Sequence, residues 1–348
     1  MKGAYARPPH VGGLRLHLNE NTAGCSPRVL EALAALSATD VSFYPDYDAV
    51  YRETAAHLGV SQDRLVLVNG LDEGILMAAV VAFQRRPAGR ALPEAIVVQP
   101  SFDMYGITAR ACGGVVVDAM PRADFSFPLE AVLAAVSPRT RLVFVTSPNN
   151  PTGTRVTTED IHAVARAVPP GALVFVDEAY HDFCGDTCLP LVDECANLIV
   201  GRTFAKAHGL AALRAGAIVA ADDTLEPFRR VIPPYSLNVA AAVALRAALA
   251  DTGRLAWYID QVERSRQAFY RFCERRGFAY WPSGANFVLA RVGPIAGALV
   301  RDLAARGIHI RDKSGDPGCD GCIRVTTGVL ADTERCIAAM EEILCDAR

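Results

Sequence analysis

A lysine among small residues is the first candidate for chemistry in this sequence. Lys206 lies in GRTFAKAHGLAALRAG (201–216), directly after the apolar run NLIV (197–200). Burial of an ammonium group costs free energy and lowers its pKa, and a neutral lysine amine is a nucleophile that forms a Schiff base with an aldehyde or ketone. A lone lysine of this kind also fits an ordinary solvent-exposed turn. The residues near it in the fold are therefore needed to distinguish a nucleophilic lysine from an ordinary one.

Polar groups also follow the apolar runs that precede this segment. Asp177 ends ALVFVD (172–177), where a carboxylate requires a cation or hydrogen-bond donors, and Tyr180 follows it closely. Asn150 belongs to SPNNPTG (147–153), in which prolines on both sides of two asparagines favour a rigid turn that presents an amide. Each of these features alone also fits a purely structural role.

Two further loops are suited to a planar, phosphorylated ligand. NGLDEG (69–74) joins an apolar run to a helix, and the free N–H groups at a helix N-terminus favour a phosphate. Phe102 follows EAIVVQP (94–100) and could stack on a flat ring, although an aromatic residue there also fits the core. The chain contains no GxGxxG, GKS or GKT motif, which disfavours a dinucleotide or P-loop site. An amine, a carboxylate, hydroxyl and amide donors and Arg214 match pyridoxal 5′-phosphate group by group.

The order of the predicted elements places these residues at one edge of a sheet. Short apolar runs alternate with amphipathic helices up to about residue 240, which predicts an α/β fold with a parallel sheet covered by helices on both faces. Ligands bind at the carboxyl ends of the strands in such folds. We predict an N-terminal arm and helix over 1–40, a large domain over 41–240 and a smaller α+β domain over 241–348, against which the arm packs.

Several segments resemble a known enzyme family. SPNNPTG (147–153), FVDEAY (175–180) and RTFAKAHGLAALRAG (202–216) are similar to blocks of the fold-type I, aspartate-aminotransferase-like enzymes, which use pyridoxal 5′-phosphate. The chain most resembles the histidinol-phosphate aminotransferase group, whose other blocks match NENT, FYPDYDAV, NGLDEGI, ANFVLA and GCIRVTTG in order. The resemblance covers nearly the whole chain. It implies a mostly parallel seven-stranded sheet between helices, with a smaller α+β domain.

The resemblance implies a role for each residue of the cofactor site. Lys206 holds the cofactor as a Schiff base and moves the proton, and Asp177 pairs with the pyridine nitrogen. Asn150 and Tyr180 bond the 3′-oxygen, while Phe102 stacks on the ring. The phosphate is held by a further set of residues, Leu71, Asp72, Thr203 and Arg214.

The resemblance also implies how the substrate and a second chain take part. Tyr44 reaches the phosphate of the neighbouring subunit, which implies a homodimer with shared sites. Arg324 binds the acidic group of the substrate with help from Arg311, and Asn19 and Asn286 line the same mouth. The implied reaction is ping-pong transfer of an amino group between an L-amino acid, with glutamate as the first candidate, and a 2-oxo acid or imidazoleacetol phosphate.

Two positions depart from the family pattern. The residue before the lysine is Ala205 instead of serine, which removes a neutral hydrogen bond to the phosphate worth about 0.5–1.5 kcal/mol. Ala23 stands where histidinol-phosphate enzymes have a tyrosine that helps to bind the substrate phosphate. The alternative function is therefore a decarboxylase, lyase or oxidase of an amino acid on the same scaffold. A non-catalytic regulatory protein is a third possibility, which the complete cofactor set disfavours.

Composition limits the partners of this chain. Its net charge of −3 and 51% hydrophobic residues indicate a globular protein without the basic surface that nucleic acids require. No apolar run reaches the roughly 18 residues of a membrane span, and no secretory signal is visible, so we predict a cytoplasmic protein. Cys319 and Cys322 are the one tight pair among ten cysteines. Because no second pair matches them, we predict buried free thiols and no metal site, with a redox or zinc role as the alternative.

Overall fold

A seven-stranded sheet forms the centre of the larger part of the molecule. The computed structural model describes residues 11–85, 87 and 91–346. Strand β8 is antiparallel to both of its neighbours, and the other strands of this sheet run parallel to one another. This arrangement confirms the predicted mostly parallel sheet. The strands in spatial order are β2 (Leu65–Asn69), β8 (Ala215–Ala220), β7 (Leu198–Thr203), β6 (Leu173–Asp177), β5 (Thr140–Thr146), β3 (Glu94–Val98) and β4 (Val115–Ala119).

Alternate residues of each strand point to opposite faces of the sheet, so continuous apolar runs bury both faces. In β6, Phe175 packs on one side and Val174 and Val176 on the other. The Phe175 side is covered by α4 (Leu71–Gln84), α5 (Met104–Ala111) and α8 (Asp222–Val231). The opposite side is covered near β3 to β7 by α6 (Leu129–Ala135) and α7 (Thr158–Ala167), and near β2 and β8 by α1 (Pro27–Ala34), α3 (Asp48–Leu58) and α9 (Val239–Leu249).

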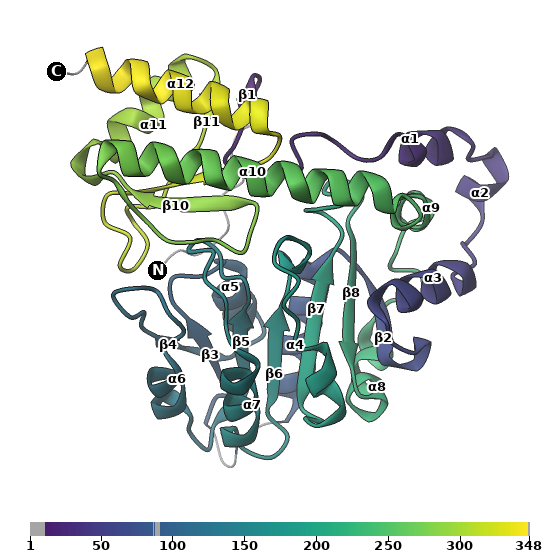
Figure 1. Ribbon diagram of the computed structural model, residues 1–348. Helices are drawn as coiled ribbons and strands as arrows, with labels where there is room; N and C mark the ends of the chain where they lie inside the picture. The colour runs from purple at the N-terminus through teal and green to yellow at the C-terminus, as the bar shows by residue number, and fades with distance from the viewer. Residues whose placement is uncertain (1–10, 86, 88–90, 347–348) are drawn as a thin grey trace.

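The C-terminal part forms a separate, antiparallel sheet with its own apolar core. Its strands follow the order β12 (Arg311–Asp312), β13 (Cys322–Thr326), β10 (Phe287–Arg291) and β9 (Ala279–Tyr280). The long helix α10 (Thr252–Arg276) runs over the large sheet, with α12 (Leu330–Asp346) beyond it (Figure 1). The core of this part also includes α11 (Ala296–Ala305) and the N-terminal strand β1 (Leu14–Arg15), which pairs with β11 (Ile308–His309). The division into domains at residues 40 and 240 stays a prediction.

Short elements complete the described chain. They are the helix α2 (Ala38–Ser42) and the 3₁₀ turns η1 (Gln62–Arg64), η2 (His181–Phe183), η3 (Leu189–Asp193) and η4 (Gly293–Ile295). Within the described ranges, no helix combines the length and the apolar character that crossing a bilayer requires. Cys319 and Cys322 are both buried, and their thiols are free.

Candidate active site

A cavity of about 310 Å³ lies where the two sheets meet. Thr146, Asp177 and Thr203 reach it from the ends of β5, β6 and β7, and Arg311 and Arg324 reach it from β12 and β13. The parallel strands therefore present their carboxyl ends to one cavity, as this fold class requires. The predicted site residues that line it are Asn19, Leu71, Asp72, Phe102, Asn150, Asp177, Tyr180, Thr203, Lys206, Arg214, Arg311 and Arg324.

The side chain of Lys206 lies inside this cavity and not on an open turn. Its Nζ donates a hydrogen bond to the carbonyl oxygen of Leu18 at 3.3 Å and lies 5.8 Å from the centre of the Tyr180 ring. The Tyr180 hydroxyl in turn accepts a hydrogen bond from Asn19 Nδ2 at 2.9 Å. The amine is thus held within a polar pocket, next to a phenol that the N-terminal arm positions.

Asp177 ends β6 with its carboxylate buried, the side chain being only 5% exposed. Its Oδ2 accepts a hydrogen bond from the Tyr105 hydroxyl at 2.7 Å, and its Oδ1 accepts one from the Ala179 N–H at 2.9 Å. Burial raises the pKa of Asp177 to about 6, although both hydrogen bonds oppose this rise because they stabilise the ionised form. A cation placed next to this carboxylate would lower its pKa and keep it ionised over a wider range of pH.

Tyr105 is a functional candidate that the sequence did not reveal as one. Its hydroxyl accepts a hydrogen bond from Thr146 Oγ1 at 2.9 Å while donating to Asp177. Burial raises the pKa of Tyr105 well above its ordinary value, so the hydroxyl keeps its proton and remains a donor. In the sequence the residue lies within an apolar helix pattern, FDMYGI, which gives no sign of a polar partner.

We expect Tyr105→Phe to weaken cofactor retention at neutral pH. Removal of the hydroxyl eliminates a hydrogen bond that lowers the pKa of Asp177, so this pKa should rise further above 6. Asp177 would then be protonated, and unable to pair with a pyridinium, at a higher pH than in the unaltered protein. The measurement is the dissociation constant of pyridoxal 5′-phosphate between pH 5 and pH 8 by fluorescence titration.

The matched control is Tyr270→Phe, which removes a partly buried tyrosine hydroxyl that accepts the Ser283 N–H at 2.8 Å, at the edge of the small sheet. We expect its binding curve to match that of the unaltered protein. If the dissociation constant varies with pH in the same way for Tyr105→Phe and the unaltered protein, the Tyr105 hydroxyl does not lower the pKa of Asp177.

The first turn of α4 and Arg214 form an anion-binding corner of the cavity. The helix begins after Gly70, with no side chain capping its first N–H groups. Gly70 has a φ of 73°, and a Cβ there would lie 2.3 Å from Arg214 Nη2, so only glycine lets the guanidinium cross the start of the helix. Arg214 donates to Asp72 Oδ2 at 2.8 Å and to the Ala211 carbonyl at 3.1 Å. Uncapped amides beside a guanidinium are a phosphate site.

The opposite end of the cavity holds two arginines on neighbouring strands. Arg311 and Arg324 are direct cross-strand partners in β12 and β13. Arg324 is buried, donates to the Asn150 Oδ1 and also donates to the His17 carbonyl at 2.7 Å. Because like charges directly opposite each other in a sheet are destabilising, their placement here indicates a site for an acidic ligand.

Two other residues at this end were missed in the sequence. Lys313 lines the cavity and forms an ion pair with Asp316, while burial lowers the pKa of its amine. His17 also lines it, and its buried Nδ1 has no hydrogen-bond partner within the described part of the chain. Burial lowers the pKa of His17 to about 4, so its ring is neutral near pH 7. Neither residue lies in a segment whose pattern points to a site.

Two predicted residues do not line the cavity. Asn286 was expected at its mouth, but the structure places it fully buried behind Asn19, where its Nδ2 donates to the Asn19 carbonyl at 3.2 Å. It therefore supports a lining residue instead of lining the cavity itself, because its side chain is fully buried and bonded to the backbone of Asn19. Tyr44 is 77% exposed and stacks on Tyr235 with ring centres 4.1 Å apart. Its predicted reach into a second subunit stays a prediction.

Comparisons with known proteins agree with this geometry. The family described as aminotransferase class I and II matches residues 12–342. The histidinol-phosphate aminotransferase of Moorella thermoacetica is 36% identical, over 95% of this chain and 85% of its own. The structure of histidinol-phosphate aminotransferase from Sinorhizobium meliloti, in complex with pyridoxal-5′-phosphate, superposes with a TM-score of 0.84 at 28% identity over 96% of this chain and 92% of its own. L-threonine-O-3-phosphate decarboxylase from Porphyromonas gingivalis shares the fold, with a TM-score of 0.78 at 22% identity over 95% and 99% of the two chains.

The cavity fits pyridoxal 5′-phosphate at each of its reactive positions. Lys206 offers the amine, and Asp177 offers a carboxylate whose burial raises its pKa to about 6. The uncapped start of α4 and Arg214 offer the phosphate corner. The family match spans nearly the whole chain, including all residues that line the cavity. The chain belongs to the class I and II aminotransferases and is a pyridoxal-phosphate-dependent aminotransferase of fold type I.

Proposed function

We propose that this enzyme transfers the amino group of glutamate to a phosphorylated or carboxylated 2-oxo compound, with imidazoleacetol phosphate as the first candidate. The observation that carries the proposal is a cluster of three cationic side chains, Arg311, Lys313 and Arg324. They line the same cavity as Lys206. Three cations at one end suit a substrate whose remote group carries one or two negative charges. The curated relatives named histidinol-phosphate aminotransferase support the same substrate class.

Each residue around the cavity would have a distinct role in the reaction. When bound, pyridoxal phosphate withdraws electrons from the substrate's α-carbon. Lys206 Nζ would hold the cofactor and then act as the base that takes the proton from this carbon. Asp177 would stay ionised opposite the ring nitrogen, and Tyr105 would keep it oriented through the 2.7 Å hydrogen bond. Arg324, which donates a hydrogen bond to Asn150, would bind the acidic group of the substrate. It would thereby hold the α-carbon of the substrate near the Lys206 amine.

We further propose that the enzyme is a homodimer with shared sites. Exposed Tyr44 and Tyr235 form a stacked pair outside the cavity of their own chain, which leaves them accessible to a second chain. Tyr44 would then bind the cofactor phosphate of the neighbouring subunit. We also propose that the enzyme is cytoplasmic, as the sequence analysis predicted.

A set of half-reactions tests the proposed function. We expect glutamate, added without any keto acid, to convert the bound cofactor to its amino form, with 2-oxoglutarate reversing the change. Histidinol phosphate should give the same change if it is the physiological partner. Absorbance of the cofactor measures both steps. If other amino acids convert the cofactor to its amino form and histidinol phosphate does not, the protein is an aminotransferase with a different substrate.

Lys313 provides a specific test of substrate class. We expect Lys313→Gln to raise KM for histidinol phosphate by about tenfold, because a hydrogen bond to a charged group contributes roughly 1.5 kcal/mol or more. Glutamate should be affected less, since its carboxylate carries a single charge. Lys313→Arg retains the charge and should restore KM. Equal KM values in Lys313→Gln and the unaltered enzyme would remove Lys313 from the substrate site.

A decarboxylase is the second candidate function. It is favoured by Ala23, which packs beside Tyr258 and leaves the cavity without the expected tyrosine, and by the fold shared with L-threonine-O-3-phosphate decarboxylase. The residues of the cavity do not choose by themselves which bond at the α-carbon is broken. Release of CO₂ from an amino acid, with no change that 2-oxoglutarate reverses, would favour this function over amino transfer.

A further inference from the structure

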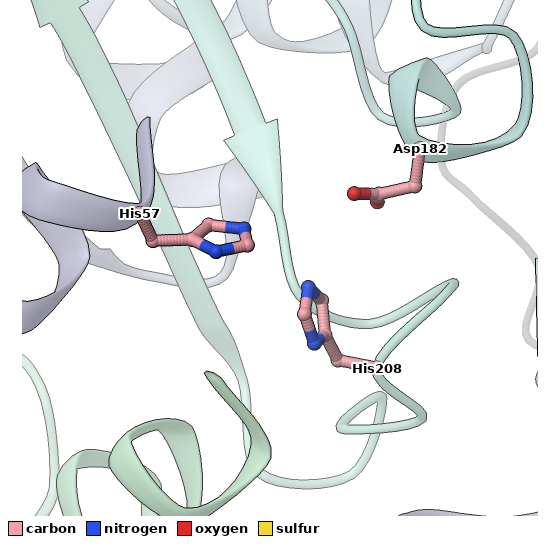
Figure 2. A group of neighbouring side chains, drawn as sticks. All are labelled: His57, Asp182 and His208. Atoms are coloured by element: carbon pink, nitrogen blue, oxygen red, sulfur yellow. The ribbon is translucent and has the colours of Figure 1, made fainter. Parts of the chain in front are cut away.

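Three potential metal ligands from distant parts of the chain converge outside the active-site cavity. His57 lies in the last turn of α3, Asp182 lies in η2, and His208 lies two positions after Lys206 in the turn that follows β7. One possible ligand atom from each lies within 4.8 Å of the other two. Figure 2 shows both imidazole rings and the carboxylate pointing toward a common space. Nothing in the proposed amino transfer uses these residues.

The ligand atoms are available for another partner. His208 is only 6% exposed, yet its ring makes no hydrogen bond or ion pair with any described residue. Asp182 and His57 likewise have no side-chain hydrogen bond or ion pair within the described ranges. An imidazole on a residue that is only 6% exposed, with a carboxylate and a second imidazole facing it, is suited to bind a cation between them.

The ligand set is typical of a divalent transition metal. Two imidazole nitrogens and one carboxylate oxygen bind Zn²⁺ at about 2.0–2.2 Å, and tetrahedral geometry then separates the ligand atoms by roughly 3.4 Å. A maximum separation of 4.8 Å requires only small side-chain rotations, and His57, on the exposed last turn of α3, is free to make them. A water molecule would occupy the fourth position, as at other sites with three protein ligands.

The surrounding charges permit a cation. Arg202, whose charge acts on His57, forms a buried ion pair with Glu178 at 2.8 Å, which offsets its positive charge. The neighbouring His181 is engaged elsewhere, since its Nδ1 lies 2.8 Å from the Asp186 carbonyl oxygen. His181 is therefore a natural control residue beside the cluster.

We propose that His57, Asp182 and His208 bind one divalent transition-metal ion of the Zn²⁺ class, which ties α3 and η2 to the turn that carries Lys206. The metal bridges three segments that the chain connects only over long distances. Because Lys206 and His208 share one short turn, binding would restrict the movement of the amine-bearing loop. The role assigned to the ion is structural, and the inference does not depend on which substrate the enzyme uses.

Aromatic packing is the competing explanation for the two rings. His57 and His208 lie 5.5 Å apart between ring centres, and His208 lies 5.4 Å from the Phe204 ring. His208→Phe retains a ring for this packing but removes both nitrogens, and Asp182→Asn leaves the packing untouched. These two substitutions therefore separate a metal site from a packed cluster.

The test is a Zn²⁺ titration of untagged, chelator-treated protein that carries Cys345→Ser, which removes the exposed thiol. Calorimetry should give one ion per chain, and thermal unfolding should shift upward with added Zn²⁺. We expect His208→Phe, Asp182→Asn and His57→Gln each to weaken binding at least about tenfold, with retained folding shown by circular dichroism. His181→Gln should bind Zn²⁺ like the parent protein, and so should Lys206→Ala, whether or not amino transfer is found.

Co²⁺ in place of Zn²⁺ gives an independent spectroscopic signal, since a tetrahedral site with nitrogen and oxygen ligands produces visible absorption bands. These bands should vanish in Asp182→Asn and persist in His181→Gln. Equal Zn²⁺ affinity and Co²⁺ spectra in the three ligand variants and the parent protein would overturn the proposal. An increase in thermal stability by His208→Phe without any metal response would identify the cluster as aromatic packing.

Discussion

Lys206→Ala is expected to abolish amino transfer, with kcat/KM falling by at least about 10⁴-fold. The amine lies in the cavity within hydrogen-bond distance of the Leu18 carbonyl and beside Tyr180, and among the residues that the structure describes Lys313 is the one other lysine that lines the cavity. Removal of the amine eliminates both the covalent anchor of the cofactor and the base for the α-carbon proton. Steady-state kinetics with glutamate and 2-oxo acids measure the loss.

Lys206→Arg is the matched control for charge. The guanidinium keeps the positive charge in the cavity, but it remains protonated and is not a nucleophile. We expect it to be as inactive as Lys206→Ala, with native circular dichroism for both. Activity within tenfold of the unaltered enzyme in either variant would exclude Lys206 as the residue that carries the chemistry.

Asp177→Asn is expected to lower kcat by about 10²–10⁴-fold while making the cofactor-free protein more stable at neutral pH. The loss of activity follows because a neutral amide cannot stabilise a protonated ring nitrogen. The gain in stability follows because, in the cofactor-free protein at neutral pH, Asp177 is mostly ionised although it is buried, and burial of an ionised carboxylate costs free energy. The carboxylate is thus maintained for binding and catalysis at a cost to the fold.

The pH dependence of this effect has a definite sign. The pKa of Asp177 is about 6 in the folded state and 3.8 as an ordinary side chain, so between about pH 4 and pH 6 the folded protein binds more protons than the unfolded one. The free energy of unfolding of the cofactor-free protein should therefore fall as pH rises through this window, by up to about 3 kcal/mol. Asp177→Asn should not show this fall.

Urea unfolding of the cofactor-free proteins at pH 4.5 and pH 7.5 measures the difference. The advantage of Asp177→Asn over the unaltered protein should be larger at pH 7.5. Glu130, an exposed carboxylate on α6, supplies the control substitution Glu130→Gln, which should show no such gain. An equal stability difference at both pH values would show that the pKa of Asp177 is not raised in the folded state.

Much of the cofactor site was predictable from local sequence. Lys206, Asp177 and Asn150 were predicted from short segments, because each follows a recognisable apolar strand and parallel strands bring their carboxyl ends together. Arg214 reaches the same edge from the start of the antiparallel strand β8. The alternation of strands and helices predicted the covered sheet for the same reason. Periodicity and the succession of strands and helices along the chain are properties of neighbouring residues, which the sequence displays directly.

Contacts between distant elements were decided only by tertiary structure. The hydroxyl of Tyr105, on α5, donates to Asp177 at the end of β6, and Asn286, just before β10, donates to the carbonyl of Asn19 in the N-terminal segment. Lys313 enters the cavity through a turn of the small sheet. Each contact depends on how one element packs on another and on the direction of a side chain, neither of which periodicity contains.

The cluster of His57, Asp182 and His208 shows this difference between local sequence and tertiary packing most clearly. The sequence indicated no metal site, because His57, Asp182 and His208 lie in three segments without ligand spacing. Folding brings their ligand atoms within 4.8 Å of one another. The sequence by itself determined the family, the cofactor and the residues at the strand ends, since these are written in contiguous segments. Tertiary structure alone decided the partners of Asp177, the cationic end of the cavity and the cluster beside Lys206, because packing between segments creates them.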